Sequence, residues 1–279
     1  MIRRICVTAA LLAAGAIIGW AGSAGGTAKP AQAPAKAPAF PDGRLIDLSH
    51  AFNERTIYWP TAESFKLEVV ADGETEQGYH YAANNFSAAE HGGTHLDAPV
   101  HFSKGGDTAD EIPLRRLVGR GTVVDVTRRA LADRDYQVAV SDLRAHERRY
   151  GRIGRGAIVL LRTGYERYWP ARVRYMGTAE LGVQAVLKRH FPGLHPNAAR
   201  LLVRRGIRAV GLDTASIDYG QSKLFESHRV LGAAGVPVFE NVARLSRLPR
   251  RNFLVIALPM KIDRGSGGPL RIMAIAPRR

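Results

Sequence analysis

The chain has 279 residues, 46% of them hydrophobic, and carries a formal net charge of +15 at pH 7. This composition suits a globular protein of one large or two small domains and excludes a fibrous or wholly disordered chain. The only cysteine, Cys6, lies in the leader segment, so the mature chain has neither a disulfide nor a thiol catalyst, which excludes cysteine hydrolases and redox proteins.

Residues 1–24 have the layout of a secretory signal peptide. Arg3 and Arg4 precede an apolar run, and small residues follow it through Ala24. We expect cleavage near Ala24, a secreted or periplasmic location, and no stable membrane span after cleavage. An uncleaved anchor is the alternative, but the run is short for a span of about 20 residues. Residues 25–42 are rich in Ala and Pro and are predicted to be a linker, so the folded domain is expected over 43–279.

The folded part begins with residues that favour strands. Polar and apolar residues alternate over 44–50, and 65–70 is a second candidate. Trp59 lies between them, and packing in the core is the ordinary role of such a residue.

The segment 91–101 contains three histidines and a carboxylate: His91, His95, Asp97 and His101. Their positions differ by even numbers, and an extended chain points every second side chain to one face. Two glycines and a proline disfavour a helix here, so we expect a strand or an extended loop. Imidazole nitrogens and a carboxylate oxygen are ligands that zinc prefers and manganese accepts, which predicts a metal site. The alternative is a set of hydrogen-bonding loop residues.

The rest of the chain alternates between strand and helix patterns, which indicates an α/β protein. Three short apolar runs predict strands, at 122–126, 157–161 and 207–213. Three capping patterns predict helices, at 142–150 after Ser141, from Thr178 to about 190, and from Asn197 to about 205. The aromatic and basic segment 165–176 is expected to form a lid over the site or a subunit contact.

The motif at 91–101 resembles the His-x-Gly-Thr-His-x-Asp-x-Pro-x-His signature of the cyclase family of metal-dependent hydrolases, which includes kynurenine formamidases and isatin hydrolases. The resemblance implies that His91, His95 and Asp97 bind metal and that His101 donates and accepts protons. It also implies a swivelling β/β/α-like fold, a single α/β domain with a sheet-rich core and flanking helices, assembled as a homodimer or homotetramer.

The likeness continues in the second half of the chain. His228 and Glu240 are twelve positions apart, the spacing at which kynurenine formamidases place the residues that complete a second metal position. In that arrangement Asp97 would lie between two ions. Isatin hydrolases use one manganese ion and have a different residue at the glutamate position, so Glu240 favours two ions. We therefore expect Zn or Mn, with one or two ions per subunit.

Other residues are expected to support this site. The resemblance implies that Trp59 lines the substrate pocket, and Phe102, which directly follows the motif, is predicted to line it as well. Asp213 and Asp218 are predicted either to orient the ligand imidazoles or to form a polar turn. The remaining histidines are assigned no catalytic role: His50, His80, His146, His190 and His195.

These observations predict a metal-dependent hydrolase of a small amide C–N bond, in an aryl formamide or in a cyclic amide such as isatin, by metal-activated water. The alternative is a secreted metal-binding or carrier protein without catalysis, which gives no role to His101. The basic charge raises nucleic-acid binding as a further class, but the arginines are dispersed and no nucleic-acid motif is present. We therefore expect a small-molecule amide substrate and no nucleic-acid partner.

Overall fold

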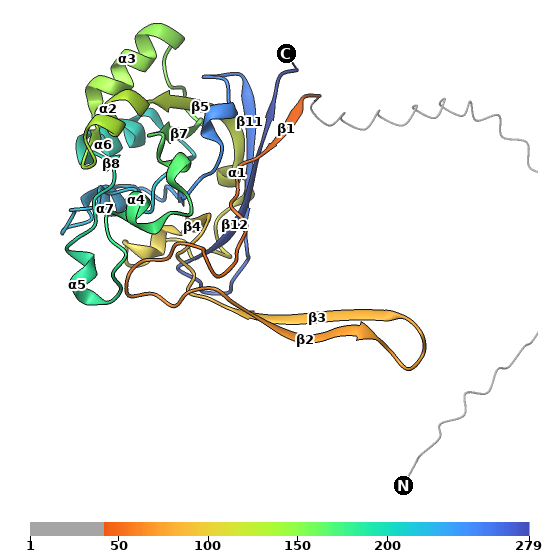
Figure 1. Cartoon of the computed structure of the whole chain (residues 1–279). Coiled ribbons are helices and arrows are strands. Elements are labelled where there is room, and N and C mark those ends of the chain that lie inside the picture. Colours follow the sequence, from red (N-terminus) through yellow and green to blue (C-terminus); the bar gives the residue numbers. More distant parts are fainter. Residues whose placement is uncertain (1–41, 279) are drawn as a thin grey trace, which may run out of the picture. The chain divides into compact units, whose positions relative to one another are not determined.

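Three hydrophobic segments form parallel strands at the centre of the main sheet (Figure 1). They are β5 (Val118–Asp125), β7 (Ile158–Arg162) and β9 (Ala209–Leu212). The structure is a computed structural model and describes residues 42–278. Along β7, alternate residues enter two different cores: Ile158 and Leu160 face one, Val159 and Leu161 the other. Strands buried on both faces are continuously apolar, which is why the sequence predicted all three.

The main sheet closes on itself into a barrel-like core. Its strand order is β1-β12-β11-β5-β7-β9-β10-β4, and β4 pairs a second time, with β12. The closing strand β4 (His95–Asp97) therefore lies between β10 (Val238–Glu240) and β12 (Gly267–Ala276), antiparallel to both. The other strands of this sheet are β1 (Arg44–Asp47) and β11 (Phe253–Pro259). This closure holds the short motif strand in place.

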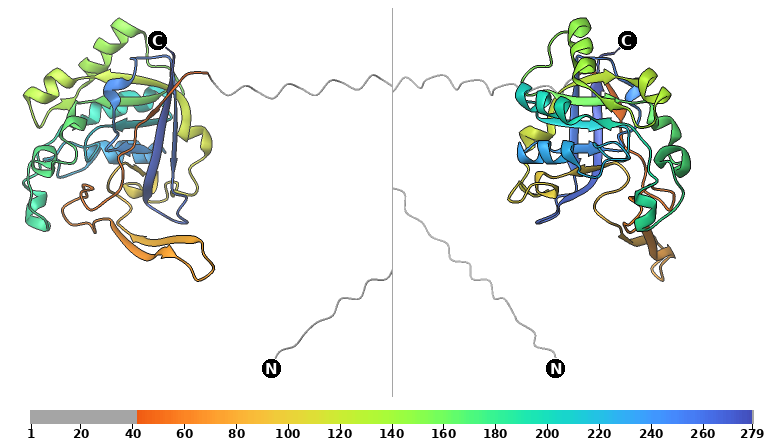
Figure 2. Two further views of the ribbon diagram at one scale, coloured as in Figure 1. Left: turned by 45° about the vertical axis from the view of Figure 1, so that its right-hand side comes forward. Right: turned by 90° about the vertical axis from the view of Figure 1, so that its left-hand side faces the viewer.

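Helices cover the parallel part of the sheet, whereas β1, β11 and β12 lie on the opposite side (Figures 1 and 2). Alanine and leucine side chains of the longer helices pack with alternate residues of β5, β7 and β9 in the second core. These helices are α2 (Thr127–Ala132), α3 (Val140–Tyr150), α6 (Pro196–Arg205) and α7 (Glu226–Ala233). The prediction of an α/β domain with a sheet-rich core and flanking helices is confirmed.

Short elements connect these layers. They are α1 (Leu114–Leu117), α4 (Arg172–Met176), α5 (Val183–Val186), β6 (Gln137–Val138), β8 (Gly193–Leu194) and the 3₁₀ turns Pro99–His101, Tyr165–Tyr168 and Leu245–Arg247. Within residues 42–278, none of the helices is long and apolar enough to cross a membrane. The predicted signal peptide at 1–24 and residues 25–41 of the predicted linker lie outside the described residues.

A β-hairpin projects from the body (Figures 1 and 2). It consists of β2 (Lys66–Glu74) and β3 (His80–Ser87), which among the described residues pair only with each other. The first strand was predicted at 65–70. The second was not, because its alanines and asparagines carry no β-type alternation.

Two of the helix predictions were inaccurate at their start. α3 begins at Val140, two residues before the predicted start, because the Asp142 carboxylate accepts a hydrogen bond from the backbone N–H of Ala139 (2.8 Å) and so caps the helix there. α6 begins at Pro196, since the ring of His195 accepts a hydrogen bond from the backbone N–H of Asn197 (3.1 Å).

The helix predicted from Thr178 to about 190 was wrong. Only the four residues of α5 are helical in that stretch. Gly177 and Gly182 both have positive φ (91° and 83°), a conformation that interrupts a helix. The Thr178 hydroxyl accepts a hydrogen bond from the Glu180 backbone N–H (3.1 Å), which makes a local turn instead.

Two tyrosines near the ends of the aromatic segment 165–176 pack into the protein and form no lid, whereas the alternative of a subunit contact stays a prediction. Tyr165 and Tyr175 are buried with Ile57 and Phe191 in a third hydrophobic cluster. The Tyr175 hydroxyl donates a hydrogen bond to Asn241 Oδ1 (2.9 Å), next to the end of β10. Burial of these large aromatic side chains removes their apolar surface from water and stabilises the fold, which exposure on a lid would not do.

The buried His146 should make the free energy of unfolding depend on pH. Burial, followed by the charges of Arg251 and Arg250, lowers its pKa to about 4, and the neutral ring hydrogen-bonds Thr122 (3.1 Å). An unfolded histidine has a pKa near 6.5, so the unfolded state binds more protons as pH falls below 6.5. We expect the free energy of unfolding of the wild type to fall by about 2 kcal/mol more than that of His146→Gln between pH 7 and pH 4.5.

Urea denaturation at several pH values measures this difference. His146→Gln keeps a donor for Thr122 and removes the titrating group. The same loss of stability in both proteins would contradict a buried neutral His146.

Candidate metal centre

The register of the closing strand brings His95, Asp97 and Glu240 together. His95 of β4 is paired directly with Glu240 of β10, and paired residues of antiparallel strands share one face. Asp97 lies two residues further along, on the same face. His95 Nε2 is 3.2 Å from Asp97 Oδ1 and 3.5 Å from Glu240 Oε2. All three side chains are buried, and their ligand atoms lie within 4.8 Å of one another.

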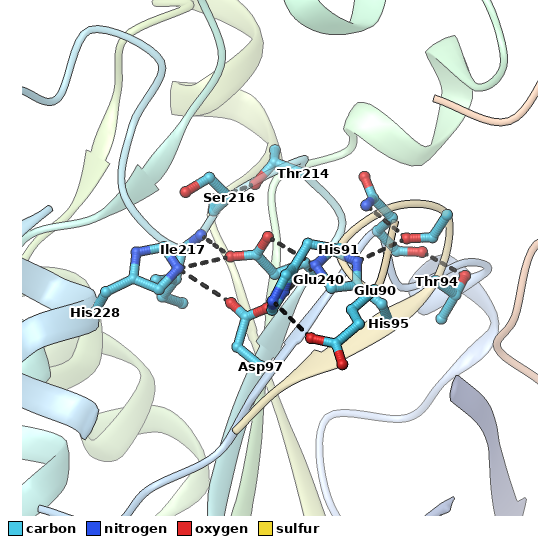
Figure 3. Close-up of polar contacts among 12 residues, drawn as sticks. Glu90, His91, Thr94, His95, Asp97, Thr214, Ser216, Ile217, His228 and Glu240 are labelled. Carbon is cyan, nitrogen blue, oxygen red and sulfur yellow. Dashed lines mark hydrogen bonds and ion pairs between the residues drawn. The ribbon is translucent and has the colours of Figure 1, made fainter. Parts of the chain in front are cut away.

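Helix α7 supplies His228 to the same cluster (Figure 3). Its Nε2 atom lies 3.1 Å from Asp97 Oδ2 and 3.2 Å from Glu240 Oε1. Its Nδ1–H donates to Asp218 (2.7 Å), whose carboxylate also accepts the backbone N–H groups of Ser227 and His228 at the start of the helix. Asp218 therefore orients a cluster imidazole, one of its two predicted roles.

His91 approaches from the turn before β4. Its Nδ1 atom lies 2.7 Å from Asp97 Oδ1, and its Nε2 atom hydrogen-bonds Ser266 Oγ (2.9 Å). Gly267 of β12 leaves room for this ring, because a Cβ there would lie 2.6 Å from His91 Cε1. Gly93 has a φ of 57°, the left-handed region that favours glycine, and turns the chain between His91 and β4.

The expectation that the whole motif is extended was wrong. Only His95–Asp97 is a strand, Gly93 breaks the alternation before it, and Pro99–His101 is a 3₁₀ turn. The four side chains nevertheless meet, because the chain turns back at both ends of β4. The His101 ring stacks on that of His91, with centroids 3.9 Å apart.

The donor set fits a divalent cation. The outer nitrogens of the three imidazoles are bonded to protein acceptors: a backbone carbonyl for His95, a carboxylate for His228, and the Ser266 hydroxyl for His91. Ser266 donates its own proton to Glu90, so it accepts from His91. Neutral rings with these partners point lone pairs at the two inner carboxylates, an arrangement that requires either extra protons or a metal ion.

The pKa shifts of the cluster residues also indicate that positive charge stabilises the two inner carboxylates. Burial favours a low pKa for His95, but the hydrogen bond and charge of Asp97 and the charge of Glu240 outweigh it and raise its pKa to about 9. Despite burial, hydrogen bonds from His228 and His91 hold the pKa of Asp97 well below its usual value. Burial and the charge of Asp97 raise the pKa of Glu240. A divalent ion can replace the protons that these rings otherwise hold.

A cavity of about 290 Å³ opens beside the cluster. The predicted pocket residues Trp59 and Phe102 both line it, together with Phe225, which lies 6.2 Å from Trp59 and 5.3 Å from Phe102 between ring centroids. The guanidinium of Arg189, itself buried, lies 3.6 Å from the centre of the Trp59 ring. The wall is therefore aromatic and fixed, which suits a flat ligand.

His101 also lines the cavity. Burial, only partly offset by the charge of Asp97, lowers its pKa to about 4, so the ring is neutral at pH 7 and able to accept a proton. Its ligand atom also lies within 4.8 Å of those of His91 and Asp97, so the same geometry allows metal binding. The predicted role of His101 in proton transfer remains a prediction.

Several residues beside the site were assigned no role from the sequence. Phe225, Asn241, Glu90 and Ser266 lie beside the motif residues only in the folded chain. Asp213, the other predicted orienting residue, instead accepts hydrogen bonds from the turn after β7, from Thr163 and Gly164, so it matches its alternative role in a polar turn.

A family model described as a putative cyclase matches residues 46–219, more than half of the chain, so the chain belongs to this family. The resemblance seen in the motif is thereby confirmed. Isatin hydrolase of Roseibium aggregatum is 29% identical over 247 residues, which cover 85% of this chain and 89% of the relative. Kynurenine formamidase of Salinibacter ruber is 28% identical over 232 residues, covering 81% and 95%.

A similar solved structure is also that of an isatin hydrolase. Isatin hydrolase A from Labrenzia aggregata, bound to benzyl benzoate, is 30% identical, with a TM-score of 0.75 over 84% of this chain and 94% of the other. These relatives are hydrolases by name, and the likeness supports a hydrolase.

Asp218 yields a prediction for metal affinity. Asp218→Asn removes the carboxylate that accepts the Nδ1 proton of His228, so Zn²⁺ or Mn²⁺ should bind about 10- to 100-fold more weakly. Titration calorimetry measures the dissociation constant. Asp135→Asn is the matched control, because Asp135 accepts a hydrogen bond from the partly exposed His190 (2.7 Å) outside the cluster. Equal affinities of Asp218→Asn and the control would show that this contact does not support a metal site.

Proposed function

We propose that the protein is a metal-dependent hydrolase of a small amide C–N bond in an aromatic substrate, either an aryl formamide such as N-formylkynurenine or a cyclic amide such as isatin. One observation carries the proposal: a cluster of imidazoles and carboxylates forms one end of a cavity whose walls are aromatic. The relatives named isatin hydrolase and kynurenine formamidase support the same class.

His91, His95, Asp97, His228 and Glu240 would hold the metal. A divalent ion lowers the pKa of water to about 7 and polarises a carbonyl oxygen, the two effects that amide hydrolysis needs. Zinc and manganese both accept this mixture of nitrogen and oxygen donors. The outer partners of the imidazoles, including Asp218 and Ser266, fix the tautomers that leave the inner nitrogens free to bind.

The remaining pocket residues would position the substrate and move its protons. Trp59, Phe102 and Phe225 would hold a planar ring and keep bulk water from its faces. The neutral ring of His101 lies between these aromatic side chains and the cluster, in contact with Phe102 (4.5 Å between centroids) and His91. It would accept a proton from water and return it to the leaving nitrogen.

Two variants separate proton transfer from metal binding. His101→Ala should retain bound metal while its kcat falls at least 100-fold, since general acid–base catalysis contributes about 10²–10⁴-fold. His95→Ala should lose both metal and activity, because His95 faces both carboxylates. Metal analysis and kcat on the same preparations measure both effects. Normal turnover in His101→Ala would refute its role, and loss of metal from it would make His101 a ligand.

The arrangement of Asp97 predicts two ions per subunit. Its Oδ1 atom faces His91 and His95, whereas its Oδ2 atom faces His228, so the carboxylate has an imidazole neighbour on each side. Elemental analysis after reconstitution with excess Mn²⁺ or Zn²⁺ should give close to two ions per chain. A count close to one would leave a single-ion site as the better description.

The test of the proposed activity is hydrolysis of N-formylkynurenine and isatin by the metal-loaded protein beside a chelated sample. Activity on either substrate that disappears with chelator and returns with metal supports the proposal and selects the subfamily. Failure on both, and on a wider panel of amides and esters, would favour the alternative of a metal-binding or carrier protein.

Export is part of the proposal and rests on the leader pattern at 1–24 alone. N-terminal sequencing of the protein recovered from the cell exterior or periplasm would test cleavage near Ala24.

A further inference from the structure

Two guanidinium groups lie behind the aromatic wall of the cavity. That of Arg189, which is 2% exposed, lies 3.6 Å from the centre of the Trp59 ring, and its Nε–H donates to the backbone carbonyl of Val186 (2.6 Å). The half-buried Arg172 donates to the backbone carbonyl of Tyr58 (3.0 Å). Tyr58 and Trp59 both line the cavity, so two positive charges lie behind the same part of its wall.

Neither charge has a carboxylate partner among the described residues. Burial lowers the pKa of Arg189 to about 10 and also lowers the pKa of Arg172, and no carboxylate of residues 42–278 opposes either shift. Both groups are therefore still protonated at pH 7. A buried charge is costly unless it is paired, and a ring face or a carbonyl group is a weaker partner than a carboxylate. This wall therefore favours a ligand that brings a negative charge.

The ring of Trp59 separates Arg189 from the cavity, since of these two residues only Trp59 lines it. Van der Waals contact with the inner face of the ring adds about 3.5 Å, so a ligand atom there would lie about 7 Å from the guanidinium. With an effective dielectric constant of about 20, attraction over this distance changes the affinity for an anion by on the order of tenfold. The carboxylates that line the cavity are Asp97 and Glu240, and both face the imidazole cluster, where a bound ion would offset them.

We propose that the cavity takes an aromatic ligand that carries a carboxylate, and that Arg189 favours this ligand by its charge, which acts through the Trp59 ring. The inference rests on the proposed function and narrows its substrates to amides whose aromatic part bears an anionic group. Arg189 is a positioning residue, because it attracts the anion from behind the wall without touching it. The net charge of +15 would also draw anions towards the protein.

Two ligands without a hydrolysable bond test this preference apart from catalysis. Ortho-aminobenzoate and ortho-aminoacetophenone share the ring and the amino group and differ in charge. In titration calorimetry on the metal-loaded protein, Arg189→Gln should bind ortho-aminobenzoate about tenfold more weakly than the wild type does. Its affinity for ortho-aminoacetophenone should change less than about twofold, because an uncharged ligand does not interact with the removed charge. Arg189→Lys keeps the charge and should retain most of the affinity for ortho-aminobenzoate.

Arg149→Gln is the matched control. The exposed Arg149 lies over the Tyr150 ring (5.5 Å) outside this cavity, and its replacement removes the same charge. Equal losses for both ligands in Arg189→Gln would show that Arg189 only shapes the wall, and an unchanged affinity for ortho-aminobenzoate would also overturn the proposal. If Arg189→Gln does not fold, Arg172→Gln allows the same comparison, with an expected loss of about threefold because Arg172 is only half-buried.

Turnover tests the proposed function separately. Ortho-formamidobenzoate should have a lower KM than formanilide in the wild type, and Arg189→Gln should remove this difference. Charge-selective binding without turnover of either formamide would refute the proposed activity and leave the ligand preference intact. Turnover of both formamides with equal KM values, and no charge-selective binding, would refute the ligand preference alone.

Discussion

The site depends on one buried carboxylate, Asp97, held among three imidazoles. A charge in this position is tolerated only if it is paired and hydrogen-bonded, and Asp97 has His91, His95 and His228 within 3.2 Å. Its strand is only three residues long and is kept in register by β10 and β12 on either side. Closure of the sheet thus fixes the positions of the side chains of this short strand relative to one another.

The same closure also gives a role to particular residues of the two strands that pair with β4. The direct pairing of Glu240 with His95 brings the second carboxylate to the site without any loop rearrangement. Gly267, opposite Asp97, has no side chain to compete with the His91 ring. A cluster built mainly on strands, with one histidine from a helix capped by Asp218, is more rigid than one built on loops. Rigidity of this kind suits chemistry that needs preorganised charge.

The central strands and the part of the candidate site at 91–101 could be read from local patterns in the sequence, whereas His228 and Glu240 were predicted only from the resemblance to the family. The runs that became β7, β9 and the second half of β5 are mostly apolar, and the motif residues lie within eleven positions. What could not be read depends on distant contacts. Ser266 supports His91 from 175 residues away, and Phe225 reaches the cavity from the start of α7.

The errors have the same origin. Even spacing correctly grouped the histidines with Asp97, but for an incomplete reason, because the turns at Gly93 and Pro99–His101 bring His91 and His101 back to the cluster. The helix expected after Thr178 failed because two glycines with positive φ interrupt it. A lid was one of the two roles expected of the aromatic segment, yet Tyr165 and Tyr175 are covered by residues far away in sequence.

Anomalous diffraction from crystals of the metal-loaded protein tests the central claim most directly. We predict peaks at the absorption edge of the added metal within ligand distance of Asp97, among His91, His95, His228 and Glu240. An occupied metal position elsewhere in the chain, with none beside Asp97 at saturating metal, would contradict the account.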